Sequence, residues 1–274
     1  MTGAHAAPRS AGRPGGRELA ELSGPAAAEL GPEAIVVLPV GSIEHHGPHL
    51  PLATDLLMAD LMSARVVAAA VGAGLDVWRL PALAYTKSDE HDWAPGTVWI
   101  DADTLLATLR RIGLSVAATG ARRLVFYNGH GGNVALLQVA LRELRRLAGL
   151  QTFLLNVGVP AGPTELGFGI HGGQGETSLL LHLRPELVDL SLAAPAVPEH
   201  LADFERIGFG GAPVQFGWLS DDFGSGGVIG DPTGASAEEG ARIAADLVDE
   251  GVASLAEIAR FDPRPPAAGE GGAA

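Results

Sequence analysis

The sequence predicts an α/β domain in which a mostly parallel β-sheet lies between layers of helices. Short apolar runs alternate along the chain with longer segments of helical periodicity, and this alternation is typical of parallel sheets. Each cluster of interesting polar residues directly follows an apolar run, as expected where parallel strands end at one edge of a sheet. Because 47% of the 274 residues are hydrophobic and only 18% are charged, the chain can bury a substantial core.

The first half of the chain predicts two strands, each followed by a helix. AIVVLPV (34–40) is a short apolar run typical of a buried strand, and DVWRLPAL (76–83) is the next strand candidate. The segment 56–71 is apolar and rich in alanine. Asp60 and Arg65 interrupt it, so we interpret it as a packed helix and not as a membrane span. In the second helix, 103–119, apolar residues recur at helical spacing, at positions 105, 109, 112 and 116.

The second half predicts two more strands and three helices. RRLVFYN (122–128) is the third strand, and the amphipathic segment 133–149 is a helix that glycine ends. TFLLNVG (152–158) is the fourth strand. ETSLLLHL (176–183) predicts a helix up to the following proline, and the last helix is expected at 237–255.

Composition and the chain ends limit the classes of function. The formal net charge of −14 argues against nucleic acid and anionic membrane surfaces as partners. The chain has no cysteine, so a metal would be held by nitrogen and oxygen only, and a cytoplasmic location is compatible with this. Residues 1–17 lack the apolar stretch of a secretory signal and predict a disordered leader. Residues 261–274 predict a disordered tail, which leaves 18–260 as the folded domain.

The stretch GSIEHHGPHLPLATD (41–55) predicts a metal site. Glu44 and His46 are two residues apart, so their side chains point the same way in an extended segment. Asp55 follows just before the first helix, where the intervening prolines can fold the loop back. Two carboxylates and an imidazole suit a divalent ion such as zinc, manganese or iron. The alternative is a polar loop in which Asp55 caps the helix.

Three further loops carry candidate residues. NGHGGN (128–133) projects His130 at the end of the third strand, with Asn133 as a helix cap in the alternative interpretation. It lacks the lysine of a phosphate loop and the spacing of a dinucleotide fingerprint. HGGQGETS (171–178) brings His171 and Glu176, where the glutamate could instead serve the helix start. Glu90 and His91 lie after the second strand and, with Gly131 and Gly132, are predicted to line a substrate pocket. A solvated acidic loop is the alternative there.

The positions of the histidines along the sequence favour a single metal site. Three of the nine, His5, His182 and His200, lie outside the motifs. The other six fall in loops that share one predicted face of the sheet, at positions 45, 46, 49, 91, 130 and 171.

The motifs LPVGSIEHHGPHLPLATD, NGHGGN and HGGQGETS, in this order, resemble those of the creatininase family of metal-dependent amidohydrolases. The resemblance spans about residues 30–185. It implies a single three-layer α/β/α domain, one or two divalent ions per chain (zinc, manganese or iron), and a homo-oligomer, commonly a hexamer. It also implies that Glu44, His46, Asp55 and His130 are metal ligands, with Asp55 bridging two ions where two are bound.

The resemblance further implies roles for two residues of the third motif. Glu176 matches a carboxylate beside the centre, as ligand or as acid/base, and His171 matches a histidine that assists proton transfer. Two positions depart from the family pattern. Creatinine-cleaving members carry a glutamate ligand where this chain has Gly132, so the second ion would be lost, weaker or held by Glu176. His45 replaces a usual glutamine and is expected to point away from the ligands.

These observations together predict a hydrolase in which a metal-activated water cleaves an amide-type C–N bond. The substrate would be a small cyclic amide, a formamide or a short peptide. Two alternatives remain: a metal-dependent lyase, isomerase or C–C hydrolase acting on a sugar-like carbonyl compound, and a non-catalytic metal-binding assembly protein. The glycine-rich segment 216–236 is interpreted as a lid, as a subunit-contact loop or as a plain surface loop.

Overall fold

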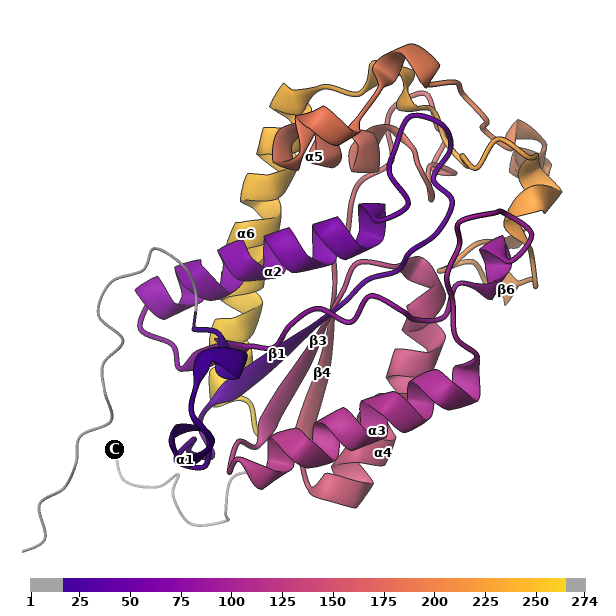
Figure 1. Ribbon diagram of the computed structural model, residues 1–274. Coiled ribbons are helices and arrows are strands. Elements are labelled where there is room, and N and C mark those ends of the chain that lie inside the picture. Colours follow the sequence, from indigo (N-terminus) through magenta and orange to yellow (C-terminus); the bar gives the residue numbers. More distant parts are fainter. Residues whose placement is uncertain (1–16, 265–274) are drawn as a thin grey trace, which may run out of the picture.

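The computed structural model describes residues 17–264, and its centre is a four-stranded parallel sheet (Figure 1). The strands are β1 (Ile35–Val40), β2 (Val77–Arg79), β3 (Arg123–Asn128) and β4 (Gln151–Asn156). Their order across the sheet is β2-β1-β3-β4. From β1 the chain proceeds to one edge through β2 and then crosses to β3, on the other side of β1. The carboxyl ends of β1 and β3 therefore form the switch point at which such sheets bind ligands.

Helices cover both faces of the sheet, which confirms the predicted α/β domain in three layers. On one face lie α2 (Thr54–Gly72), α5 (Gln174–Leu183) and α6 (Ala237–Arg260), and on the other α3 (Ala102–Ala118) and α4 (Val134–Ala148) (Figure 1). Side chains of β1 alternate between the two cores, as strand geometry requires. Ile35 and Val37 pack toward α2, whereas Val36 and Leu38 pack toward α3 and α4.

The predicted elements are all present, and most of their ends lie within two residues of the expected positions. The second strand is shorter than predicted, because it ends at Arg79. The Leu80 amide still donates to Val37, but Pro81 has no N–H to donate, and pairing with β1 resumes at a bridge between Leu83 and Val40. The last helix is longer than predicted and runs to Arg260, because its apolar stripe continues through the buried Leu255 and Ile258.

Short elements complete the chain between these layers. β5 (Ile207–Gly208) and β6 (Val214–Gln215) form a separate two-stranded sheet. Besides α1 (Gly24–Ala27), the short helices are η1 (Leu19–Glu21), η2 (Asp89–His91), η3 (Gly131–Asn133), η4 (Pro185–Leu187), η5 (Leu190–Leu192), η6 (Glu199–Asp203), η7 (Ser220–Phe223) and η8 (Pro232–Gly234).

The predicted leader and tail fall mostly outside the described residues, as does His5. The guanidinium of Arg17 pairs with Asp76, and the ring of Phe261 contacts Phe153, so the described ends of the chain lie against the domain. Across residues 17–264, no helix combines the length and the apolar character that a membrane crossing requires. α2 packs into the core instead, through residues such as Met58 and Met62.

Candidate metal centre

Two glycines set the position of the first turn of α2 at the ends of β1 and β3. A Cβ atom at Gly41 would lie 2.4 Å from Cα of Leu56, and one at Gly129 would lie 2.7 Å from the carbonyl oxygen of Asp55. Only glycine permits so close an approach of backbones. Asp55 does not cap α2: the N-cap residue is Ala53, and the capping interpretation is wrong. The Asp55 side chain is free to face the strand ends.

Asp55 lies between two histidines. Its Oδ1 is 3.2 Å from Nε2 of His46, and its Oδ2 is 3.0 Å from Nδ1 of His130; all three side chains are buried. Burial would raise the pKa of the Asp55 carboxyl, but the two imidazoles hold it well below its usual range. The carboxylates in turn raise the pKa of His46 to about 9, against the effect of burial. Asp55 and His46 therefore each favour the charged form of the other.

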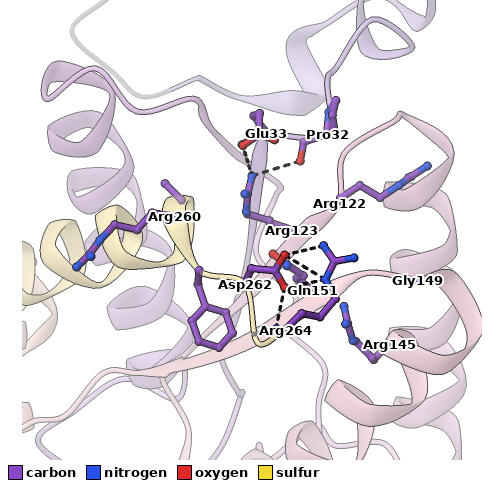
Figure 2. Close-up of a pocket in the computed structure, with 12 residues that line it drawn as sticks. Pro32, Glu33, Arg122, Arg123, Arg145, Gly149, Gln151, Arg260, Asp262 and Arg264 are labelled. Carbon is purple, nitrogen blue, oxygen red and sulfur yellow. Dashed lines mark hydrogen bonds and ion pairs between the residues drawn. The ribbon is translucent and has the colours of Figure 1, made fainter. Parts of the chain in front are cut away.

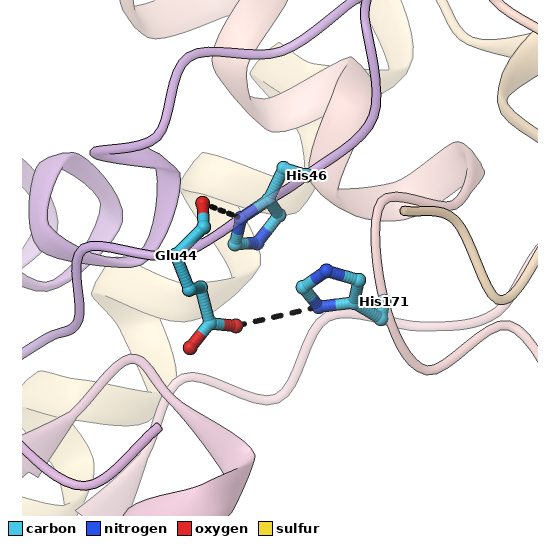
Figure 3. Close-up of side chains that lie close together, drawn as sticks. All are labelled: Glu44, His46 and His171. Carbon is cyan, nitrogen blue, oxygen red and sulfur yellow. Dashed lines mark hydrogen bonds and ion pairs between the residues drawn. The ribbon is translucent and has the colours of Figure 1, made fainter. Parts of the chain in front are cut away.

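Glu44 faces the same space from the loop after β1. Ser88 donates a hydrogen bond of 2.6 Å to its Oε2, which lies 3.3 Å from Nε2 of His130. Its Oε1 lies 3.5 Å from Nδ1 of His171 (Figure 3). Burial raises the pKa of Glu44 to about 8, although the neighbouring imidazoles oppose this shift. The side chains of Glu44 and His46 thus line one site, as their spacing predicts.

Glu176 and His171 approach this site from the start of α5. Oε2 of Glu176 accepts the amide of Gly172 at 2.7 Å and also lies 3.9 Å from Nε2 of His46. The glutamate therefore serves the helix start and the cluster together. Burial raises its pKa to about 7. Nε2 of His171 donates to the carbonyl of His45 at 2.7 Å, which turns Nδ1 toward Glu44.

His45 itself points away from the cluster, as predicted. Its ring packs edge-on against Trp93, with ring centroids 5.7 Å apart. Its contribution to the site is the backbone carbonyl that orients His171, a role that the sequence did not reveal.

The four residues predicted to line a substrate pocket divide into two groups. Glu90 and His91 are buried, so the interpretation as a solvated acidic loop is wrong. Oε1 of Glu90 lies 3.3 Å from Nε2 of His130, and Nε2 of His91 lies 3.5 Å from Oε1 of Glu44. Gly131 lines a cavity, whereas Gly132 lies directly against Glu90. Glu90 and His91 therefore belong to the metal cluster by position.

The described side chains form three overlapping groups of metal-donor atoms, each within 4.8 Å. The groups are Glu44, His46 and His171; Glu44, Glu90 and His130; and His46, Asp55 and Glu176. Oε1 of Glu44 and Oε2 of Glu90 are buried without a hydrogen-bond partner. Buried carboxylate oxygens without donors are unfavourable, so this set fits a divalent cation with nitrogen and oxygen ligands.

A cavity of about 270 Å³ leads to the cluster and is lined by His130, Gly131, His171 and Glu176, among others. A larger cavity of about 770 Å³, lined by Arg122, Arg123 and other residues, lies where β3 and β4 begin (Figure 2). It is at the opposite end of the strands from the cluster. The smaller cavity is therefore the route by which a substrate would reach these side chains.

Some supporting residues were not identified from the sequence. Ser88 donates a hydrogen bond to Glu44. Asn133 connects three loops, because its Nδ2 donates to the Gly41 carbonyl at 3.1 Å and its Oδ1 accepts from the Lys87 amide at 3.3 Å. Asn133 occupies the N-cap position of α4 without capping it. Glu165 accepts the amides of Gln174 and Asp231 and so organises the loop before α5. The only sequence signal was the proximity of Ser88 and Asn133 to the motifs.

The family model described as "Creatininase: Creatinine amidohydrolase" matches residues 20–255. The chain belongs to the creatininase family. It is 40% identical over 243 residues to a mycofactocin precursor peptide peptidase from Mycobacterium ulcerans (strain Agy99), covering 84% of this chain and 86% of that protein. It is 39% identical over 181 residues to a creatinine amidohydrolase from Pseudomonas putida, covering 58% and 67%.

A solved structure titled "Creatininase Mn" superposes with a TM-score of 0.67 at 29% identity and covers 90% of this chain and 100% of that one. The protein is thus a creatininase-family enzyme, a metal-dependent hydrolase of amide-type C–N bonds. The lyase, isomerase, C–C hydrolase and non-catalytic interpretations are not favoured. The family's fold agrees with the three layers described above.

Proposed function

We propose that this creatininase-family enzyme is a peptidase that hydrolyses an amide bond of a short peptide. The observation that carries the proposal is that His171 and Glu176 line a cavity and also face the buried cluster of Glu44, His46, Asp55 and His130. The similarity to a peptide peptidase extends over 84% of the chain, whereas the match to a creatinine amidohydrolase covers 58%. A peptide substrate therefore has more support than a cyclic amide or a formamide.

The ligands that we propose are Glu44, His46, Asp55 and His130, with Glu176 as a fifth ligand or as the base. A divalent cation held by these residues would lower the pKa of a bound water toward ~7 and would polarise an amide carbonyl. Glu176, whose pKa burial raises to about 7, is suited to take the proton of the attacking water near neutral pH. Its bond from the Gly172 amide keeps the carboxylate in place while it does so.

His171 is the proposed acid that protonates the leaving nitrogen. Its Nε2–H is held by the carbonyl of His45, and this bond fixes the ring so that Nδ1 faces the cluster. Burial and the nearby His46 and His91 imidazoles lower the pKa of His171 well below its usual value, so the ring takes up a second proton only during turnover; both nitrogens then donate, Nε2 to His45 and Nδ1 to the leaving group. The proton that Glu176 takes from water passes to His171 and from there to the leaving nitrogen, so both side chains return to their starting forms.

Several wider properties belong to the same proposal. The enzyme takes one or two zinc, manganese or iron ions per chain and works as a cytoplasmic homo-oligomer, for which a hexamer is the first candidate. It has no nucleic-acid or membrane partner, which the formal charge of −14 supports. The domain that carries this activity spans residues 18–260. The segment 216–236 acts as a lid or a subunit contact beside the site, where its Ile229 pairs with the backbone of His171.

The test is a substrate panel with metal control. Purified protein is stripped with EDTA, reloaded separately with zinc, manganese or iron, and incubated with mycofactocin precursor peptide, with creatinine and with a formamide. Products are followed by mass spectrometry. We expect cleavage of the peptide, abolished by EDTA and restored by at least one metal. Metal-dependent turnover of creatinine alone would overturn the peptide assignment, and metal-independent cleavage would overturn the mechanism.

A further inference from the structure

Glu90 reaches the metal cluster from a loop that carries none of the ligands proposed above. It lies in η2, after β2, and its Oε1 is 3.3 Å from Nε2 of His130. Oε2 of Glu44 lies 3.3 Å from the same nitrogen. Glu44, Glu90 and His130 form a donor group separate from that of His46, Asp55 and Glu176. These two groups share no residue and so offer two separate cation positions, while the third group, Glu44, His46 and His171, takes one residue from each and adds His171.

The group around His130 contains more oxygen atoms than its hydrogen-bond donors can satisfy. Nε2 of His130 faces Glu44, Glu90 and, at 2.8 Å, the carbonyl of Lys87. One ring N–H makes one good hydrogen bond and Ser88 donates to Oε2 of Glu44, so Oε1 of Glu44 and Oε2 of Glu90 are left without a donor. The ammonium of Lys87 is 3.8 Å from Oε2 of Glu90, beyond hydrogen-bond distance, and pairs with Asp89. A divalent cation would supply the missing positive charge.

Gly132 leaves the space that Glu90 occupies. A Cβ atom at position 132 would lie 2.0 Å from Oε1 of Glu90 and 2.5 Å from Nε2 of His130. A side chain at 132 and Glu90 in its present position therefore exclude each other. The carboxylate that the sequence lacks at position 132 is thus replaced in space by one that comes from a different loop.

We propose that Glu90 is a ligand of a second divalent cation, held together with Glu44 and His130, and that glycine at 132 is required to make room for it. Asp55 contacts Nδ1 of His130, the ring nitrogen on the side away from the Glu44 and Glu90 oxygens, so it would orient this histidine while it belongs to the other group of donors. This assignment rests on the proposed metal-dependent function. It places Glu90 among the metal ligands instead of the substrate pocket, and it gives Glu176 to the other cation.

The experiment counts manganese ions in the full-length, metal-free protein by equilibrium dialysis and records their electron paramagnetic resonance spectrum. We expect two ions per chain in the wild type, with the broadened spectrum of two coupled ions. Glu90→Ala and the near-isosteric Glu90→Gln should keep one ion with the six-line spectrum of isolated manganese, or bind the second at least about tenfold more weakly. Gly132→Ala should act in the same way, because it displaces Glu90.

Asp89→Asn is the matched control, since Asp89 neighbours Glu90 in η2 but pairs with Lys87; it should keep two coupled ions. Circular dichroism establishes that each variant is folded. Two coupled ions bound by Glu90→Ala with the affinity of the wild type would overturn the assignment. One ion in the wild type would also overturn it while leaving the proposed function intact. No ion in any form would refute the proposed function itself.

Discussion

Gly129 lies in contact with the backbone of Asp55, so closely that a Cβ atom at position 129 would be 2.7 Å from the Asp55 carbonyl oxygen. Gly129 directly follows β3, and Asp55 lies in the first turn of α2. Their contact determines the position of the Asp55 carboxylate relative to His130. The candidate metal centre therefore depends on glycines that themselves carry no chemistry.

Gly129→Ala should displace the first turn of α2 and damage both stability and metal binding. Overpacking of a tight contact typically costs about 1–3 kcal/mol of the free energy of unfolding. Gly131→Ala is the control, because a Cβ atom there would meet nothing within 4 Å. Urea unfolding and metal analysis of both variants check the prediction. Equal stability and equal metal content for the two variants would contradict it.

Asp55→Ala should remove most of the bound metal. The carboxylate faces both His46 and His130, and no other described side chain makes that pair of contacts. Asp60→Ala in the same helix is the control, because Asp60 pairs with Arg79 away from the cluster. Metal content per chain, measured after gel filtration, distinguishes the two variants. Full metal content in Asp55→Ala would show that the centre is elsewhere.

His171→Ala should keep its metal and lose turnover. Removal of a positioned proton donor typically lowers kcat about 10²- to 10⁴-fold. His182→Ala, a substitution within α5 at a residue that contacts Arg65, should retain normal turnover. Steady-state kinetics and metal analysis are measured on the same preparations. Near-normal turnover in His171→Ala would remove His171 from the mechanism, and loss of an ion would make it a ligand.

His49 should make the folded state less stable as the pH falls. Burial lowers the pKa of His49 to about 4, and its Nε2 contacts Oγ1 of Thr177 at 3.0 Å. The unfolded chain takes up this proton near pH ~6.5, before the folded protein does. The contribution is therefore fully present above pH ~6.5 and is lost as the pH falls toward 4.

Urea unfolding of the metal-free wild type and of His49→Gln at several pH values between 4 and 7.5 measures this effect. The variant cannot take up the proton, so its free energy of unfolding should fall less steeply with decreasing pH. The other buried histidines titrate in both proteins and cancel in the comparison. Parallel pH profiles for the two proteins would exclude a role for His49.

The fold was largely predictable from the sequence, because strands buried on both faces read as short continuous apolar runs. β1 and β3 are of this kind, and every residue in them is buried. The carboxyl end of β2 was less predictable. Whether the residues after Pro81 pair with β1 depends on where β1 lies in the folded chain, which the local sequence does not show. The length of α6 was also missed, because its last turns are stabilised by packing and not by local sequence.

The candidate site was predictable where its residues share a motif. Glu44, His46, Asp55 and His130 converge because two adjacent parallel strands end at one edge of the sheet. The place of Glu90 was not predictable from spacing, since it depends on the empty volume beside Gly132 and on the path of the loop after β2. The role of the His45 carbonyl was equally hidden, because sequence motifs record side chains and not backbone oxygens.

The strand order β2-β1-β3-β4 has a consequence for unfolding. The side chains of the cluster come from loops after β1, β2 and β3 and from the start of α5, so residues from 44 to 176 meet only when the sheet is in register. A cation in this cluster would act as a cross-link that the unfolded chain lacks. A free metal concentration of 100 times the dissociation constant would add about 2.7 kcal/mol to the free energy of unfolding. The melting temperature should therefore report metal occupancy directly.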